Sequence, residues 1–186
     1  MDLRLSAAFQ SAPRAFFLPA DQKRFAQVDA PLPIGFGVTN SQPTTVANML
    51  SLLEVRGGQK VLDVGSGSGW TSALLSELVG QEGEVLAVER VPELVTRSSQ
   101  ILEDWSNVRV FEATPGVFGL PDQGPFDRIL VSAMAEELPG GLVDQLAPGG
   151  LMVIPVASRM LRVEKKSSGQ VSVTSHGLYS FVPLLP

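Results

Sequence analysis

A glycine-rich turn is the feature of this sequence best suited to holding a ligand. In VLDVGSGSGW, Gly65, Gly67 and Gly69 occupy alternate positions between an apolar run and a helix-like segment. Glycine has no Cβ and adopts positive φ, so the backbone of such a turn can come close to a ligand. The helix that follows adds free N–H groups and the positive end of its dipole. The pattern predicts a nucleotide-type site, and a tight turn without a ligand is the alternative.

Two acidic residues accompany this turn. Asp63 lies two positions before the first glycine, inside the apolar run, and Glu89 ends the next apolar run. An acid at the end of the second strand of a doubly wound sheet can accept hydrogen bonds from both hydroxyls of a ribose. A solvated acid at a strand end is the alternative for Glu89. Dinucleotide sites usually carry G-x-G-x-x-G, whereas the spacing here is G-x-G-x-G.

This spacing, preceded by an acid, resembles the first motif of S-adenosylmethionine-dependent methyltransferases. The resemblance implies that the turn lies alongside the methionine part of S-adenosylmethionine and that Glu89 binds its ribose. The other cofactor-binding residues implied in this region are Asp63, Gly65, Ser66, Gly67 and Gly69. NAD is the alternative cofactor.

A second motif lies before the glycine turn. The segment PLPIGFGVTNSQPTTVANML resembles a stretch that is typical of the protein-L-isoaspartate O-methyltransferase family. The resemblance continues through AFQSAPRAFFLP, GPFDRILVSA, LPGGLVDQLAPGGLMVIPV and FVPL, in family order and over nearly the whole chain. It implies a carboxyl O-methyltransferase that acts on L-isoaspartyl residues of proteins or peptides.

Three neighbouring polar residues in this segment are candidates for the substrate site. The resemblance places Ser41 beside the substrate carboxylate and the transferred methyl group, as the catalytic-site residue. Thr39 and Asn40 have short side chains that can form hydrogen bonds, and we expect them to be further substrate-binding residues. On the pattern alone, Ser41 or Asn40 as the cap of the following helix stays open. A carboxylate with a pKa near 4 is ionised at neutral pH, so methyl transfer to it requires no general base. The protein then has to align the two groups and exclude water.

Three departures from the family pattern affect these expectations. Pro115 stands where the family usually has an acid near the adenine of the cofactor, although the neighbouring Gly116 is retained as a cofactor-binding residue. Val38 and Asn40 replace the usual glutamine and isoleucine, and the loop after Val156 is short. Two alternatives therefore remain: a divergent methyltransferase for another peptide or small molecule, and a binding module that has lost cofactor affinity.

Alternating strands and helices must position these residues. The expected strands are 61–64, 84–88, 108–111, 126–132 and 150–156, followed by antiparallel strands in 161–165 and 171–182. The expected helices are 5–10, 44–54, 70–79, 92–102 and 141–146. This order predicts an α/β fold with a doubly wound, mostly parallel sheet, Rossmann-like and with antiparallel C-terminal strands. We expect one methyltransferase domain over 1–186, with an irregular N-terminal arm in 1–43 and a cofactor-binding core in 44–186.

The composition excludes several other kinds of site. The chain has no cysteine and one histidine, His176, which is expected at the surface, so no metal site is expected. A net charge of −5 without a cluster of lysine or arginine argues against a nucleic-acid partner. No apolar run reaches the roughly 18 residues of a membrane span, and no signal peptide is visible. We expect a cytoplasmic monomer, in which Arg14 has a structural role.

Overall fold

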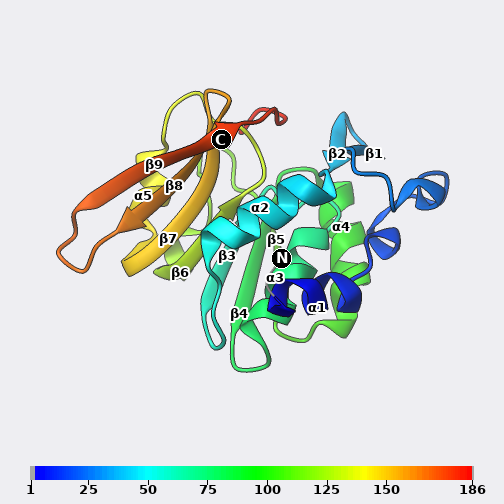
Figure 1. Cartoon of the computed structure of the whole chain (residues 1–186), viewed down its shortest axis with the longest axis horizontal. Coiled ribbons are helices and arrows are strands. Elements are labelled where there is room, and N and C mark those ends of the chain that lie inside the picture. The colour runs from blue at the N-terminus through cyan, green and yellow to red at the C-terminus, as the bar shows by residue number, and fades with distance from the viewer. Residues whose placement is uncertain (1–2, 186) are drawn as a thin grey trace.

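The computed structural model describes residues 3–185 and contains a central sheet of seven strands (Figure 1). Their order across the sheet is β5-β4-β3-β6-β7-β8-β9. The strands are β3 (Lys60–Val64), β4 (Glu84–Glu89), β5 (Val108–Glu112), β6 (Phe126–Val131), β7 (Leu146–Val156), β8 (Arg159–Lys165) and β9 (Val171–Leu178). The neighbouring strands β5, β4, β3, β6 and β7 pair in parallel. β8 pairs antiparallel with β7, and β9 pairs antiparallel with β8. The predicted fold class is confirmed.

Helices cover both faces of this sheet. They are α1 (Leu3–Ser11), α2 (Pro43–Leu53), α3 (Trp70–Val79), α4 (Pro92–Ile101) and α5 (Gly140–Asp144). Successive strand residues point to opposite faces. Val61 and Val85 therefore pack with residues of α1, α2 and α3, whereas Leu62 and Leu86 pack on the other face with Leu142 of α5. Within residues 3–185, no helix combines the length and apolarity that crossing a membrane requires.

The N-terminal arm differs from the irregular segment that the sequence predicts. It contains a two-stranded antiparallel hairpin of β1 (Leu32–Gly35) and β2 (Val38–Asn40). Its tip is left-handed throughout, with φ values of 94° at Gly35, 56° at Phe36 and 73° at Gly37. Proline is tolerated on the edges of sheets, so the prolines of this segment do not prevent a short ribbon.

The cap of α2 is a second correction. Neither Ser41 nor Asn40 caps this helix, whose N-cap residue, Gln42, makes no side-chain cap bond. The backbone N–H of Thr44 instead donates to Asp29 Oδ1 at 2.9 Å, and its hydroxyl donates to Asp29 Oδ2 at 2.8 Å. The capping carboxylate thus comes from a more distant part of the arm. The side chains of Asn40 and Ser41 remain available for other contacts.

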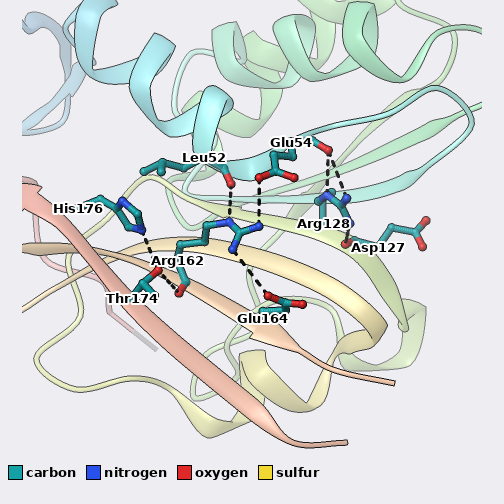
Figure 2. Close-up of polar contacts among 8 residues, drawn as sticks. All are labelled: Leu52, Glu54, Asp127, Arg128, Arg162, Glu164, Thr174 and His176. Atoms are coloured by element: carbon teal, nitrogen blue, oxygen red, sulfur yellow. Dashed lines mark hydrogen bonds and ion pairs between the residues drawn. The ribbon is translucent and has the colours of Figure 1, made fainter. Parts of the chain in front are cut away.

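The C-terminal end of α2 is held against the sheet by two arginines (Figure 2). Arg162 of β8 donates from Nε to the carbonyl oxygen of Leu52 at 3.1 Å and forms an ion pair with Glu54 at 3.1 Å. Arg128 of β6 donates from Nε to the Glu54 carbonyl at 3.3 Å. Cations at a helix C-terminus satisfy its free carbonyl groups and complement its dipole. These bonds fix the helix whose other end follows Ser41.

Candidate active site

The glycine turn connects β3 to α3 at the carboxyl edge of the sheet. Gly65, Gly67 and Gly69 have φ values of 75°, 55° and 87°, which favour glycine at all three positions. The N–H of Gly65 donates to the Val88 carbonyl at 2.8 Å, so the turn is tied to the end of β4. A Cβ at Gly69 would lie 2.8 Å from Cδ1 of Leu102. Gly69 therefore allows close packing of α3 against the segment after α4.

A cleft of about 260 Å³ lies beside this turn, and we call it the main cleft. Val64, Gly65, Gly67, Val88 and Glu89, at the ends of β3 and β4 and in the turn, line one side of it. Residues 36–39 of the hairpin and residues 182–185 near the C-terminus line other parts. Figure 1 shows the hairpin and the C-terminal end along the same, upper side of the molecule. Ligands of open α/β sheets bind at this carboxyl edge.

Glu89 presents a fixed carboxylate to the main cleft. Its Oε2 accepts a hydrogen bond from the N–H of Gly67 at 2.9 Å, and its Oε1 accepts from the N–H groups of Arg90 and Val91 at 2.7 and 2.9 Å. The side chain is only 6% exposed. Each carboxylate oxygen has two acceptor directions, and three of the four are used, so one direction on Oε2 remains for a ligand hydroxyl.

Asp63 lies beneath the turn and does not line the main cleft. Its Oδ2 accepts hydrogen bonds of 2.7 Å from the hydroxyls of Thr71 and Ser72, at the start of α3. Its Oδ1 is buried and has no partner among the described residues. Burial raises the pKa of Asp63 to about 6, and the nearby charge of Glu89 also raises it. The side chain thus ties β3 to α3 and holds the turn in place.

Arg14 connects the N-terminal arm to the residues around Ser41. Its guanidinium donates to Asn40 Oδ1 at 2.7 Å and to the carbonyl oxygens of Asn40 and Ser41 at 3.0 and 2.9 Å. It also donates to the carbonyl oxygens of Val28 and Ala30. The structural role predicted for Arg14 is confirmed.

Asn40 extends this network to the glycine turn. Its side chain is 4% exposed, and its Nδ2 donates to Ser68 Oγ at 3.0 Å. Both ends of the amide are therefore engaged, one by Arg14 and the other by Ser68. Asn40, which the sequence suggested as a substrate-binding residue, lies between the arm and the turn and has its side-chain bonds directed at protein groups.

Two smaller hollows adjoin the main cleft. The inner hollow, of about 30 Å³, lies between the arm and the turn and is lined by Asn40, Ser41 and Ser66, among others. The outer hollow, of about 70 Å³, is lined by Ser41, Gln42, Thr45 and Phe181, among others. Thr39 and Ser132 line the main cleft and both hollows. Ser132 was not predicted to be a site residue, although a serine at the end of the strand expected over 126–132 belongs at the same sheet edge as the turn.

The predicted residues separate into three groups by position. Those on the main cleft are Thr39, Gly65, Gly67 and Glu89. Asn40, Ser41 and Ser66 lie on the inner hollow. Asp63, Gly69 and Gly116 line none of these spaces.

The far end of the main cleft is made by the segment after β5. Ala113, Val117, Phe118 and Gly119 line it, whereas Pro115 and Gly116 are exposed outside it. Among the described lining residues, the carboxylate belongs to Glu89 alone. This end therefore offers apolar surface and backbone groups to a ligand, and no acidic side chain.

Comparisons with known proteins agree with this geometry. The model of the protein-L-isoaspartate(D-aspartate) O-methyltransferase family matches residues 2–186. A protein-L-isoaspartate O-methyltransferase of Methanococcoides burtonii is 43% identical over 189 residues, covering 99% of this chain and 93% of that relative. One of Methanopyrus kandleri is 44% identical, covering 98% of this chain and 83% of the relative.

Solved structures give the same result. A protein from Plasmodium falciparum, described as a putative protein-L-isoaspartate O-methyltransferase in complex with S-adenosyl-L-homocysteine, superposes with a TM-score of 0.84 at 25% identity. The superposition covers 98% of this chain and 90% of that one. The match of sequence and fold extends over nearly the whole chain, and the chain belongs to the protein-L-isoaspartate(D-aspartate) O-methyltransferase family.

Proposed function

We propose that this protein transfers the methyl group of S-adenosylmethionine to the free carboxylate of L-isoaspartyl residues in proteins or peptides. The junction of the main cleft with the outer hollow carries this proposal, because Thr39 and Ser132 line both spaces. A cofactor in the cleft and a side chain in the hollow would meet at these residues. The names of the relatives, which are protein-L-isoaspartate O-methyltransferases, support the same reaction.

The residues of the main cleft fit S-adenosylmethionine. Gly65 and Gly67 have no side chains, so a ligand can approach the backbone of the turn directly. The nearest atom to a Cβ position at Gly65, outside its chain neighbours, is Ala133 Cβ at 3.7 Å. The fixed carboxylate of Glu89 has one acceptor direction left for a ribose hydroxyl, and the hydrogen bonds of Asp63 hold the turn in place. When bound, the cofactor supplies an electrophilic methyl group on a positively charged sulfur. The apolar segment 113–119 would contact its adenine.

On the substrate side, we assign hydroxyl groups to the carboxylate. Ser41 and Thr39 line the outer hollow and donate to the substrate, with Ser41 nearest the expected site of transfer by family resemblance. Asn40 is a positioning residue that joins Arg14 to Ser68. The substrate carboxylate is already ionised at neutral pH, so these residues bind and orient it without removing a proton.

Labelled methyl transfer tests the reaction. We expect label from S-adenosylmethionine in an L-isoaspartyl peptide and none in the aspartyl peptide of the same sequence. Replacing Ser41 with Ala should leave the affinity for S-adenosylhomocysteine unchanged and reduce turnover about 10-fold or more, since a hydrogen bond to a charged group is lost. Cofactor binding without transfer would instead favour another substrate. A failure to bind S-adenosylhomocysteine at millimolar concentration would favour a binding module.

We further place this reaction on a cytoplasmic monomer that does not use nucleic acid. The net charge of −5 supports the last point, because phosphate-binding surfaces are usually basic. Light scattering coupled to size exclusion tests the monomer, and transfer of label to RNA or DNA would contradict the choice of substrate.

A further inference from the structure

Three hydroxyl groups meet at the junction of the main cleft and the two hollows. Thr39 comes from β2, Ser41 from the segment before α2, and Ser132 from the residue after β6. Thr39 and Ser132 line all three spaces, and Ser41 lines both hollows. Within residues 3–185, none of these hydroxyls has a protein partner, and neither does the buried hydroxyl of Ser66, which lines the inner hollow alone. They are therefore available to a ligand.

The position of Ser132 is set by the pairing of β3 with β6 in the middle of the sheet. Its N–H donates to the Val64 carbonyl at 2.9 Å, which continues the pairing of β3 with β6 by one residue. A Cβ placed on Gly65 would lie 3.8 Å from the Ser132 carbonyl carbon, so the serine lies directly against the glycine turn. Sites built on strands hold side chains more accurately than sites on loops. Ser132 thus gives a fixed point opposite the arm that carries Thr39 and Ser41.

Among the residues that the structure describes, no charged side chain lines the outer hollow. Its described lining residues are proline, threonine, serine, glutamine, phenylalanine and valine, without lysine, arginine or histidine. A carboxylate in this hollow would therefore be held by neutral donors. Its two oxygens have about four acceptor directions, which is enough for three hydroxyls and still leaves one lone pair for reaction. A cation here would stabilise the carboxylate in its ground state and reduce the nucleophilicity of its oxygens.

We infer that Ser132 is a substrate-binding residue that donates a hydrogen bond to the isoaspartyl carboxylate, opposite Thr39 and Ser41. This inference rests on the proposed function. A carboxylate oxygen held in this way forms the new bond to the methyl carbon with one of its lone pairs. The bond from that carbon to sulfur breaks, and its electron pair stays on sulfur. The products are a methyl ester and a neutral thioether, and no proton is transferred.

Replacing Ser132 with Ala tests this role without relying on turnover alone. We expect the affinity of an isoaspartyl peptide for the protein saturated with S-adenosylhomocysteine to fall about 10-fold or more, as for a lost hydrogen bond to a charged group. Calorimetry measures this directly. The KM for the peptide should rise by a similar factor, while the affinity for S-adenosylhomocysteine itself stays unchanged. Ser132→Thr keeps the hydroxyl and should restore most of the peptide affinity.

Ser51→Ala is the matched control. Ser51 is exposed on α2, donates its hydroxyl to the Ala47 carbonyl at 2.8 Å, and lines neither the main cleft nor the two hollows. This variant should bind peptide and S-adenosylhomocysteine as the unmodified protein does.

The outcomes separate this inference from the proposed function. Methylation of the isoaspartyl peptide by the unmodified protein, with unchanged peptide affinity in Ser132→Ala, would overturn the role of Ser132 and leave the function intact. An equal loss of affinity for peptide and S-adenosylhomocysteine in Ser132→Ala would overturn it too, since the serine would then serve the cofactor. If the unmodified protein methylates no isoaspartyl peptide, both proposals fail.

Discussion

Asp63 combines two features that rarely occur together in a stable core, since its carboxylate is fully buried and one of its oxygens has no partner among the described residues. Two hydroxyl donors stabilise the charge, yet they do not offset its loss of hydration, so the pKa rises to about 6. A residue of this kind lowers the stability of the folded state at neutral pH. A cationic ligand close to the turn would recover part of that cost, because it favours the ionised form.

The pH dependence of stability follows from this pKa. The folded state binds the Asp63 proton more tightly than the unfolded chain, whose aspartate has the ordinary value of 3.8. The contribution of Asp63 to stability is therefore fully present below pH 3.8 and is lost as the pH rises through 6. Asp63→Asn does not titrate. Its free energy of unfolding, relative to that of the unmodified protein, should rise by about 2 kcal/mol between pH 4 and pH 6, as part of a total rise of about 3 kcal/mol between about pH 3 and pH 7.

Urea unfolding at a series of pH values measures this difference. Asp104→Asn is a suitable control, because this residue ends a short turn after α4 and is exposed. A difference between Asp63→Asn and the unmodified protein that stays constant from pH 4 to pH 7 would contradict the buried, ionised carboxylate.

At the scale of elements, the sequence predicts the core better than the arm. The helix over 70–79 and the strand over 84–88 lie within one residue of α3 and β4, because continuous apolar runs and glycines mark their limits. The β1–β2 hairpin was not predicted. Its strands are only four and three residues long, and a left-handed Phe36 forms its tip. Local sequence gives little signal for such a ribbon, because tertiary contacts hold it in place.

Arg14 supplies many of those contacts, so its replacement should release the arm. Arg14→Met removes five hydrogen bonds to residues 28–41 while keeping most of the apolar volume. We expect the free energy of unfolding to fall by about 3 kcal/mol, because buried carbonyl groups and Asn40 lose their donor. Urea unfolding measures the loss. The rate of peptide methylation should fall more than the affinity for S-adenosylhomocysteine.

Arg14→Lys is the informative control for this element. Lysine keeps the charge but lacks the planar guanidinium group that donates to several acceptors at once, so it should recover only part of the stability. Full recovery with lysine would indicate that charge, rather than the bond geometry, holds the hairpin.

At the scale of the whole molecule, the site is assembled from parts that are distant in the sequence. Gly65, Gly67 and Glu89 were predictable because a strand–turn–helix order places them at one sheet edge. Ser132 reaches the same place only through the pairing of β6 beside β3. Residues 182–185, which line the main cleft near the C-terminus, are held in place by Met134, whose N–H donates to the Val182 carbonyl at 2.7 Å. No local pattern encodes such distant contacts, and for the same reason the cleft exists only in the folded chain.

A ligand that requires the assembled cleft must therefore stabilise the whole fold. S-adenosylhomocysteine at 100 times its dissociation constant should add about 2.7 kcal/mol to the free energy of unfolding. For a chain of this size, the melting temperature should rise by about 5–10 °C. Glu89→Gln replaces the carboxylate to which we assign the ribose, so the same ligand concentration should give about half that shift through a roughly 10-fold weaker affinity. Differential scanning calorimetry measures both. An unshifted melting temperature at millimolar ligand would mean that the apolar far end, formed by Ala113 and residues 117–119, does not support cofactor binding. Equal shifts in both proteins would contradict the role of Glu89.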